Sequence, residues 1–258
     1  MMHFPKTFPV PLIHLEETDS TNKYLNELCN KQCGEELTTI TADFQTSGRG
    51  QRGNSWESEA GQNLMFSFVL YPTFLKARRQ FLLSQIISLA IKEELERYVS
   101  NISIKWPNDI YWKDKKICGM LIENDLTGVH ISRSITGIGI NVNQETFPDE
   151  IKETATSLKV ETGKPVKRAG VIATVMERFE QYYEQFVQRE DLSGIREAYE
   201  ACLVNRDRDV RVLDPAGAYE AHAKGINDTG ELIVVLPDGT EREIYAGEVS
   251  VRGIYGYV

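Results

Sequence analysis

Apolar positions recur with helical and strand periods along the first 205 residues, and these patterns predict a mixed α+β domain. Segments rich in β-branched residues predict strands at residues 37–44, 63–71, 102–106, 110–112, 116–123 and 134–142. Apolar residues spaced by three and four predict helices at residues 20–32, 78–98, 165–188 and 192–203. The strand at 63–71 is apolar on both faces for much of its length, so we expect it near the centre of a sheet.

After residue 206, short strands separated by turn residues replace this pattern. The turn signals are Asp-Pro-Ala-Gly at 214–217, Asn-Asp-Thr-Gly at 227–230 and Pro-Asp-Gly at 237–239. Strands and turns at this spacing predict a small antiparallel barrel. A unit of about fifty residues is marginally stable alone, so we expect it to pack on the larger domain. The predicted domains are therefore residues 1–205 and 206–258.

Composition restricts the class of protein. The chain has 258 residues, of which 41% are hydrophobic and 26% charged, as in ordinary soluble globular proteins. Its net charge of −9 argues against a nucleic-acid-binding surface, which is normally basic. The first residues lack the apolar run of a secretion signal, and no stretch approaches the length of a membrane span. We therefore expect a cytoplasmic protein that binds neither DNA nor membrane.

Cysteine and histidine residues give no case for a structural metal. Of the four cysteines, Cys29 and Cys33 lie one helical turn apart and could in principle ligate a metal, but no other Cys or His is near them in sequence. Reduced structural thiols are the simpler interpretation. The four histidines, at positions 3, 14, 130 and 222, show no metal-ligand spacing. We therefore predict no protein-bound metal site.

The densest concentration of candidate chemistry lies at residues 48–56, where three glycines, two arginines and one tryptophan occur in nine residues. Glycine allows a backbone to approach a ligand closely, and arginine presents a fork of donors to carboxylate or phosphate. Tryptophan offers a flat face to a purine ring. We interpret this segment as an anion-binding loop that is mobile when empty and closes over a nucleotide. A flexible basic loop without a ligand remains the alternative.

Four further motifs accompany this loop. They are Asp-Ser-Thr-Asn at 19–22, Lys-Trp-Pro-Asn-Asp-Ile at 105–110, Lys-Lys-Ile-Cys-Gly-Met-Leu-Ile-Glu at 115–123 and Gly-Ile-Gly-Ile-Asn-Val-Asn at 137–143. The five motifs, in this order, resemble the biotin–protein ligases (biotin–[acetyl-CoA-carboxylase] ligases), and the resemblance runs from Ser20 to the C-terminus. It implies a mixed-sheet biotin/lipoate ligase-like catalytic domain followed by an SH3-like barrel. Some bacterial members carry an N-terminal helix-turn-helix domain. Only nineteen residues precede Ser20, so we expect the single-function type.

The resemblance also implies a reaction. The carboxylate of biotin attacks the α-phosphate of ATP, which is bound with Mg²⁺, and pyrophosphate leaves. A lysine of a biotin carboxyl carrier protein, part of acetyl-CoA carboxylase or a related carboxylase, then attacks the biotinyl-5'-AMP and AMP leaves. The free edge of a sheet that pairs with the carrier could equally pair with a second copy, so a homodimer is possible.

The resemblance assigns residues to this reaction. The predicted catalytic residues are Lys116, Lys105, Arg49 and Asp109. The predicted biotin-binding residues are Ser20, Thr21, Asn22, Gln45, Gly48, Arg49, Gly50, Gln51, Lys116, Gly119, Gly137 and Ile140. The predicted ATP-binding residues are Arg49, Gln51, Arg52, Trp56, Lys105, Asn108, Lys116, Asn141 and Arg252.

Each of these assignments has a simpler alternative in the residues themselves. Lys116 could belong to a solvated pair with Lys115 at a strand end, and Asp109 could serve an ordinary turn. Trp56 could anchor its own loop, and Arg252 could be a surface charge of the barrel. The run 20–22 could cap a helix, which is compatible with ligand binding. By strand alternation, Lys116 and Cys118 should share a face, and Cys118 could then line the pocket or lie in the core.

Gln51 departs from the family pattern, which usually has arginine at this position. Glutamine keeps hydrogen bonding but removes one charge, and charge-assisted hydrogen bonds are roughly twice as strong as neutral ones. We therefore hypothesise that this chain holds its adenylate less tightly. Two other functions stay open from the sequence. They are a lipoate–protein ligase, whose loop is typically Arg-Arg-x-Ser-Gly-Gly-Gly, and a non-catalytic biotin sensor.

Overall fold

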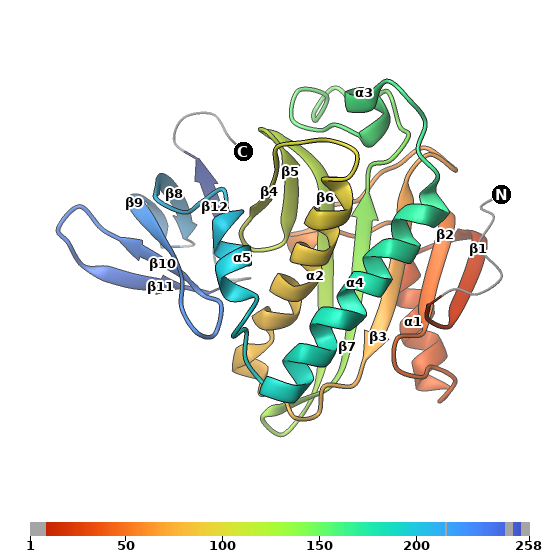
Figure 1. The fold of residues 1–258 in the computed structure, drawn as a ribbon, viewed down its shortest axis with the longest axis horizontal. Helices are drawn as coiled ribbons and strands as arrows, with labels where there is room; N and C mark the ends of the chain where they lie inside the picture. Colours follow the sequence, from red (N-terminus) through yellow and green to blue (C-terminus); the bar gives the residue numbers. More distant parts are fainter. Residues whose placement is uncertain (1–8, 215, 246–249, 254–258) are drawn as a thin grey trace.

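The computed structural model describes residues 9–214, 216–245 and 250–253, and its larger part is built on a seven-stranded sheet (Figure 1). The strand order is β1-β2-β3-β7-β6-β5-β4. Only β1 and β2 run parallel, and every other neighbouring pair is antiparallel. The strands are β1 (Leu12–Thr18), β2 (Thr39–Gln45), β3 (Leu64–Leu70), β4 (Ile102–Lys105), β5 (Asp109–Trp112), β6 (Lys115–Thr127) and β7 (His130–Ile140). The predicted central strand is β3, which is buried along its whole length.

The two faces of this sheet serve different purposes. The long helices α2 (Phe81–Leu95) and α4 (Arg168–Arg189) cover one face and enclose the main core with every second residue of β3, such as Phe66 and Phe68 (Figure 1). Helix α1 (Thr21–Asn30) covers only part of the other face, where Leu25 packs on Val69 and Ile135 in a small second core. The rest of that face is left for a pocket.

Several boundaries differ from the sequence predictions for physical reasons. Strand β1 was not predicted, because as an edge strand it is only partly buried and its apolar positions give way to Glu16 and Glu17. The β6–β7 hairpin extends beyond the predicted strands because its polar end projects past the core, where Leu126 is 55% exposed. The predicted last helix is shorter, α5 (Arg196–Ala201), and a short helix α3 (Leu158–Thr162) begins after Ser157.

A second sheet of five antiparallel strands follows, in the order β11-β10-β9-β8-β12. Its strands are β8 (Arg208–Asp214), β9 (Gly217–Ile226), β10 (Leu232–Val235), β11 (Glu241–Ile244) and β12 (Ser250–Gly253). The predicted turns join β8 to β9, β9 to β10 and β10 to β11. The sheet lies beside α5 and α2 (Figure 1). The predicted α+β fold with a C-terminal SH3-like barrel is confirmed. In the described part of the chain, no helix combines the length and apolarity needed to cross a membrane.

Candidate active site

A pocket of about 670 Å³ opens on the α1 face of the large sheet and gathers most of the predicted site. Its floor is formed by β7, β6 and β5, and its walls by the start of α1, the segment 49–56 and the segment 105–109. The predicted residues that line it are Ser20, Thr21, Asn22, Gln45, Arg49, Gly50, Gln51, Trp56, Lys105, Asn108, Asp109, Lys116, Gly119 and Gly137. Five motifs spread over 118 positions, from Ser20 to Gly137, therefore meet in one cavity.

Glycines on β6 and β7 allow neighbouring side chains to pack closely on the floor of the pocket. A Cβ atom on Gly137 would lie 2.2 Å from Oδ1 of Asn22, and one on Gly139 would lie 2.3 Å from the indole of Trp56. Any larger residue would displace these side chains, because real Cβ contacts are not this short. The side chains of Asn22 and Trp56 therefore lie directly against the strand backbone at these two glycines.

One end of the pocket is a network of neutral polar groups at the start of α1. The backbone N–H and the hydroxyl of Thr21 both donate to Oε1 of Gln45, at 2.8 and 3.0 Å. The Oγ of Ser67 lies 2.7 Å from the Thr21 hydroxyl and 2.6 Å from Oδ1 of Asn22. Thr21 and Asn22 are buried, so these bonds fix both side chains in place before any ligand arrives. Ser20 occupies the N-cap position of α1 without a side-chain capping bond.

Glu123 is a functional candidate that the sequence interpretation missed. Its Oε2 accepts a hydrogen bond from Asn22 at 2.7 Å and forms an ion pair with Nη2 of Arg49 at 3.1 Å. It therefore ties the polar wall to the glycine-rich loop. The signal was present, because Glu123 ends the quoted motif on β6 and strand alternation places it on the same face as Gly119.

The glycine-rich loop is folded back on itself. The backbone N–H of Gly50 donates to Asn54 at 2.7 Å, and that of Trp56 donates to Gly48 at 2.9 Å. Gly48 is not a lining residue. Glycine is required at this position because a Cβ there would lie 2.3 Å from the carbonyl oxygen of Trp56. The indole of Trp56 lies on the glycine floor, and its Nε1 is buried with no hydrogen-bond partner among the described residues.

The other end of the pocket is cationic. Nζ of Lys116 is 2.7 Å from Oδ1 of Asp109 and 5.9 Å from the ring centre of Trp56. Nζ of Lys105 lies 5.2 Å from the ring centre of Tyr111, and Lys105 is only 7% exposed. A largely buried ammonium group is held at this end of the cavity, where it would attract an anion. Neutral hydrogen-bonding groups and the two lysines thus line different parts of one pocket, and the Arg49–Glu123 ion pair lies beside the neutral groups.

Cys118 does not share the face of Lys116. A β-bulge lies between β5 and β6, so that Lys116 is opposite Tyr111 and Cys118 is opposite Ile110. The extra residue reverses the alternation, and Cys118 is buried in the main core beneath the sheet. Burial raises the pKa of its thiol well above the usual range, which makes it unreactive. The expectation of a shared face was wrong, and the core interpretation of Cys118 holds.

Three predicted residues do not line the pocket, and the side chains of two others lie outside the described residues. Ile140 is fully buried in the main core, because alternation along β7 turns it away from the face of Gly139. Asn141 accepts a hydrogen bond from Asn63 at 3.2 Å in a buried amide network. Gly48 acts within its loop, as described above. The side chains of Arg52 and Arg252 lie outside the described residues.

Other lining residues come from segments that no motif marked. Tyr111, Glu150, Ile151 and Thr154 add to the cationic half of the wall, and Val251 of β12 reaches it from the barrel. The segment around Thr154 is held against β6, since Lys116 N–H donates to the carbonyl of Thr154 at 2.7 Å. Only the tertiary structure brings these positions together.

In the described parts of the chain, no group of three or more His, Cys, Asp or Glu side chains could hold a metal ion.

Comparisons with known proteins agree with this geometry. The family models for the biotin/lipoate A/B protein ligase family and for the biotin protein ligase C-terminal domain match residues 15–141 and 207–252. The bifunctional ligase/repressor BirA of Bacillus spizizenii is 32% identical over 93% of this chain and 74% of its own length. The biotin–[acetyl-CoA-carboxylase] ligase of Paracoccus denitrificans is 30% identical over 93% of this chain and 100% of its own length.

A solved structure supports the same relation. The biotin protein ligase of Aquifex aeolicus in complex with biotin and ATP superposes with a TM-score of 0.82 at 33% identity, over 94% of this chain and 99% of that chain. The fold and the two-ended pocket thus define a ligase of the biotin/lipoate class. Within that class, the chain belongs to the biotin protein ligase family.

Proposed function

We propose that this protein attaches biotin to a specific lysine of a biotin carboxyl carrier protein through a biotinyl-5'-AMP intermediate, releasing pyrophosphate and AMP. The observation that carries this proposal is a single cavity with fixed neutral hydrogen-bonding groups at one end and the cations Lys105 and Lys116 at the other. Biotin has the same division, since it joins a neutral cyclic urea to a carboxylate through an apolar bicycle and tail.

The neutral end suits the urea. Ser20, Thr21 and Asn22 provide donors and acceptors, and Gln45 and Ser67 already hold the side chains of Thr21 and Asn22, so little freedom of these two is lost on binding. The cavity, about 670 Å³ in volume, has room for the bicycle and the tail.

The cationic end suits the first chemical step. Attack of a carboxylate on the α-phosphate of ATP brings two anions together, and preorganised positive charge offsets their repulsion. We assign this role to Lys116, Lys105 and Arg49, with Gln51, Arg52, Asn108 and Trp56 on the nucleotide and Asn141 and Arg252 nearby. Lys116 is neutralised by Asp109 in this structure, so it exchanges that partner for the ligand. No covalent bond to the enzyme is needed, because positioning supplies the rate.

Mg²⁺ would enter with the phosphates of ATP. Mg²⁺ is usually held by one or two carboxylates together with substrate phosphates, and the pocket offers the carboxylates of Asp109 and Glu150. When bound, the ion would neutralise phosphate charge. The donor set of the pocket fits this use.

The proposed organisation places the catalytic domain at residues 1–205 and the barrel at 206–258, supported by the two separate sheets and the separate family models. The proposed acceptor is a carrier subunit of acetyl-CoA carboxylase or a related carboxylase, with a homodimer as one possible assembly. We propose that this chain does not bind DNA, which its charge of −9 supports. The free cysteines support a place in the cytoplasm.

The test of this function is mass spectrometry of a purified biotin carrier domain incubated with the protein, biotin and Mg-ATP. We expect the mass of one biotinyl group on a single lysine, dependent on ATP. A carrier that stays unmodified under these conditions would refute the proposal.

Gln51→Arg is expected to slow release of the biotinyl-adenylate into solution by about fivefold, since a charge-assisted bond adds roughly 1 kcal/mol over a neutral one. Gln51 lines the pocket at the start of the short helical turn Gln51–Gly53, so its replacement can reach the ligand. The measurement is the rate at which labelled adenylate appears outside the protein in the absence of carrier. An unchanged rate would show that the lost charge has no part in retention.

Asp109→Ala is expected to reduce biotin transfer to the carrier by roughly 100-fold, because the carboxylate would orient the incoming lysine or the magnesium ion. The fold should stay intact, since Asp109 is partly exposed and its ion pair with Lys116 is a local contact. Asp114→Ala, in the exposed turn of the same β5–β6 hairpin, is the matched control. Normal transfer by a folded Asp109 variant would remove this residue from the mechanism.

A further inference from the structure

The β9–β10 turn of the barrel, at residues 227–230, contacts the segment that carries Lys105. The carbonyl of Gly230 in this turn accepts a hydrogen bond from the indole Nε1 of Trp106 at 3.1 Å. It also accepts a longer one from Nε2 of Gln85 on α2 at 3.4 Å. Both bonds are buried, and Trp106 follows Lys105 directly in the chain.

Trp106 is held on every side by groups outside its own segment. Its ring is 1% exposed and packs against Phe81 of α2 with ring centres 5.6 Å apart. Its backbone N–H donates to Oδ1 of Asn205 at 2.8 Å, at the point where the chain enters the barrel. The carbonyl of the next residue, Pro107, accepts a hydrogen bond from Ser84 of α2 at 3.0 Å. The backbone on either side of Trp106 is therefore held by Asn205 and α2, and its indole is held by α2 and by the barrel.

Gly230 fits this position too closely for any other residue. Its φ is +91°, and a Cβ there would lie 2.6 Å from both Gln85 and Phe81. The turn cannot easily move away, because Asn227 braces it from within. Oδ1 of Asn227 accepts bonds from the backbone N–H groups of Thr229 and Glu231, both at 3.0 Å.

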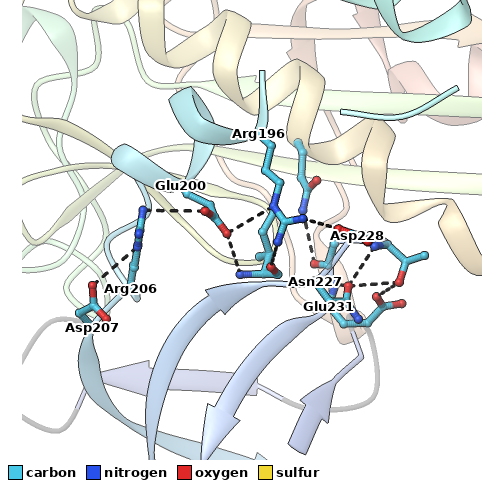
Figure 2. A network of polar contacts seen from close by, with 11 residues as sticks. Arg196, Glu200, Arg206, Asp207, Asn227, Asp228 and Glu231 are labelled. Atoms are coloured by element: carbon cyan, nitrogen blue, oxygen red, sulfur yellow. Dashed lines mark hydrogen bonds and ion pairs between the residues drawn. The ribbon is translucent and has the colours of Figure 1, made fainter. Parts of the chain in front are cut away.

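A charged network anchors the same turn to the end of the catalytic domain (Figure 2). The guanidinium of Arg196 on α5 binds Asp228 in the turn and the carbonyl of Ile226. Glu200, one helical turn further, accepts from the backbone N–H of Ile226 at 3.3 Å and pairs with Arg206 at 3.8 Å. The turn is thus fixed by contacts within the barrel and with α5. A displacement of the turn would therefore displace the indole of Trp106, which is bonded to it.

We propose that the β9–β10 turn is a positioning element for the adenylation step, with Gly230 acting through Trp106 on the placement of Lys105. The inference rests on the proposed function, in which Lys105 stabilises the reacting carboxylate and phosphate. Buried indole-to-carbonyl bonding fixes the backbone from which the Lys105 side chain enters the pocket. A shift of about 1 Å in a catalytic group can lower a rate by roughly 100-fold.

Gly230→Ala tests the proposal against Gly239→Ala. Both glycines lie in turns of the barrel with positive φ, at +91° and +85°, so alanine costs similar backbone strain at each. Only the Gly230 variant would press on the catalytic domain, because a Cβ at Gly239 meets nothing within 4 Å. We expect kcat/KM for ATP in biotin-dependent pyrophosphate release to fall by about tenfold or more for Gly230→Ala alone. The Kd for biotin, whose polar wall lies at the other end of the pocket, should stay unchanged.

Trp106→Phe gives a second measurement that does not depend on the glycine variant folding. It removes the Nε1–H donor and keeps an aromatic ring in the core, and it should lower kcat/KM for ATP in the same direction. In a Lys105→Ala background, Gly230→Ala should have little further effect, because both changes act on one group.

Two results would overturn the inference. One is a Gly230→Ala variant whose ATP kinetics match those of Gly239→Ala, whatever its Tm. The other is a loss of kcat/KM for ATP on Gly230→Ala that is just as large in the Lys105→Ala background. That result would show that Gly230 supports the packing of the barrel on the catalytic domain and does not act through Lys105. Failure of the wild-type protein to release pyrophosphate with biotin would overturn the proposed function as well, and would be seen before any variant is compared.

Discussion

Lys116→Ala is expected to lower the rate of biotinyl-adenylate formation by roughly 10²–10³-fold, the usual effect of removing one preorganised group that stabilises transition-state charge. Lys116 is the lining cation closest to the glycine floor, since its Nζ would lie 3.0 Å from a Cβ on Gly119. Its removal leaves the carboxylate and phosphate with less positive charge between them, and it also leaves Asp109 without its ion-pair partner. The measurement is biotin-dependent pyrophosphate release at saturating Mg-ATP.

Lys115→Ala is the matched control for this experiment. Lys115 is adjacent on the same strand, pairs with Trp112 and does not line the pocket. A loss shared equally by the two variants would mean that general charge at the strand end matters, and that Lys116 has no particular role. Lys116→Arg should not restore full activity, because a guanidinium is larger and planar where the site holds a compact ammonium.

Gly137→Ala is expected to weaken biotin binding by at least about tenfold, with a loss of roughly 1–3 kcal/mol in the free energy of unfolding from overpacking. The added methyl group would lie 2.2 Å from Oδ1 and 2.8 Å from Cγ of Asn22. Asn22 cannot retreat without breaking its bonds to Ser67 and Glu123. The alanine therefore disrupts the polar wall itself, and calorimetric titration with biotin measures the effect.

Gly170→Ala provides the reference for this change. Gly170 lies in α4, a Cβ there meets nothing within 4 Å, and alanine in a helix is intrinsically more stable than glycine. It should keep wild-type biotin affinity and gain stability slightly. If Gly137→Ala also kept wild-type affinity, Asn22 and the glycine floor would have no part in biotin recognition.

What could be predicted from the sequence depended on how local each signal was. The buried strand β3 was predicted because its apolar residues follow one another directly. The lining role of Lys105, Lys116 and the glycine-rich loop was predicted because short motifs carry those residues. Strand β1 was missed because a partly exposed edge strand shows little contrast between apolar and polar positions. The predicted face of Cys118 was wrong because simple alternation along a strand does not reveal a β-bulge.

The remaining features depend on contacts between distant segments. Glu150 and Val251 line the same pocket although about a hundred positions separate them, and no local pattern marks either residue. Gly230 read as an ordinary turn glycine in the sequence, and only the structure shows the indole of Trp106 against its carbonyl. Asn141 belongs to one of the motifs, but it lies just after the end of β7 and accepts a hydrogen bond from Asn63 in a buried amide network.

The most direct test of the central claim is pyrophosphate release from Mg-ATP by the purified protein, with biotin or lipoate added separately and no carrier present. We expect release that depends on biotin and is absent with lipoate. Release with lipoate but not biotin would place the chain with the lipoate ligases, and release with neither would leave a binding protein without the proposed chemistry. Either of these last two results would contradict the proposed biotin ligase activity.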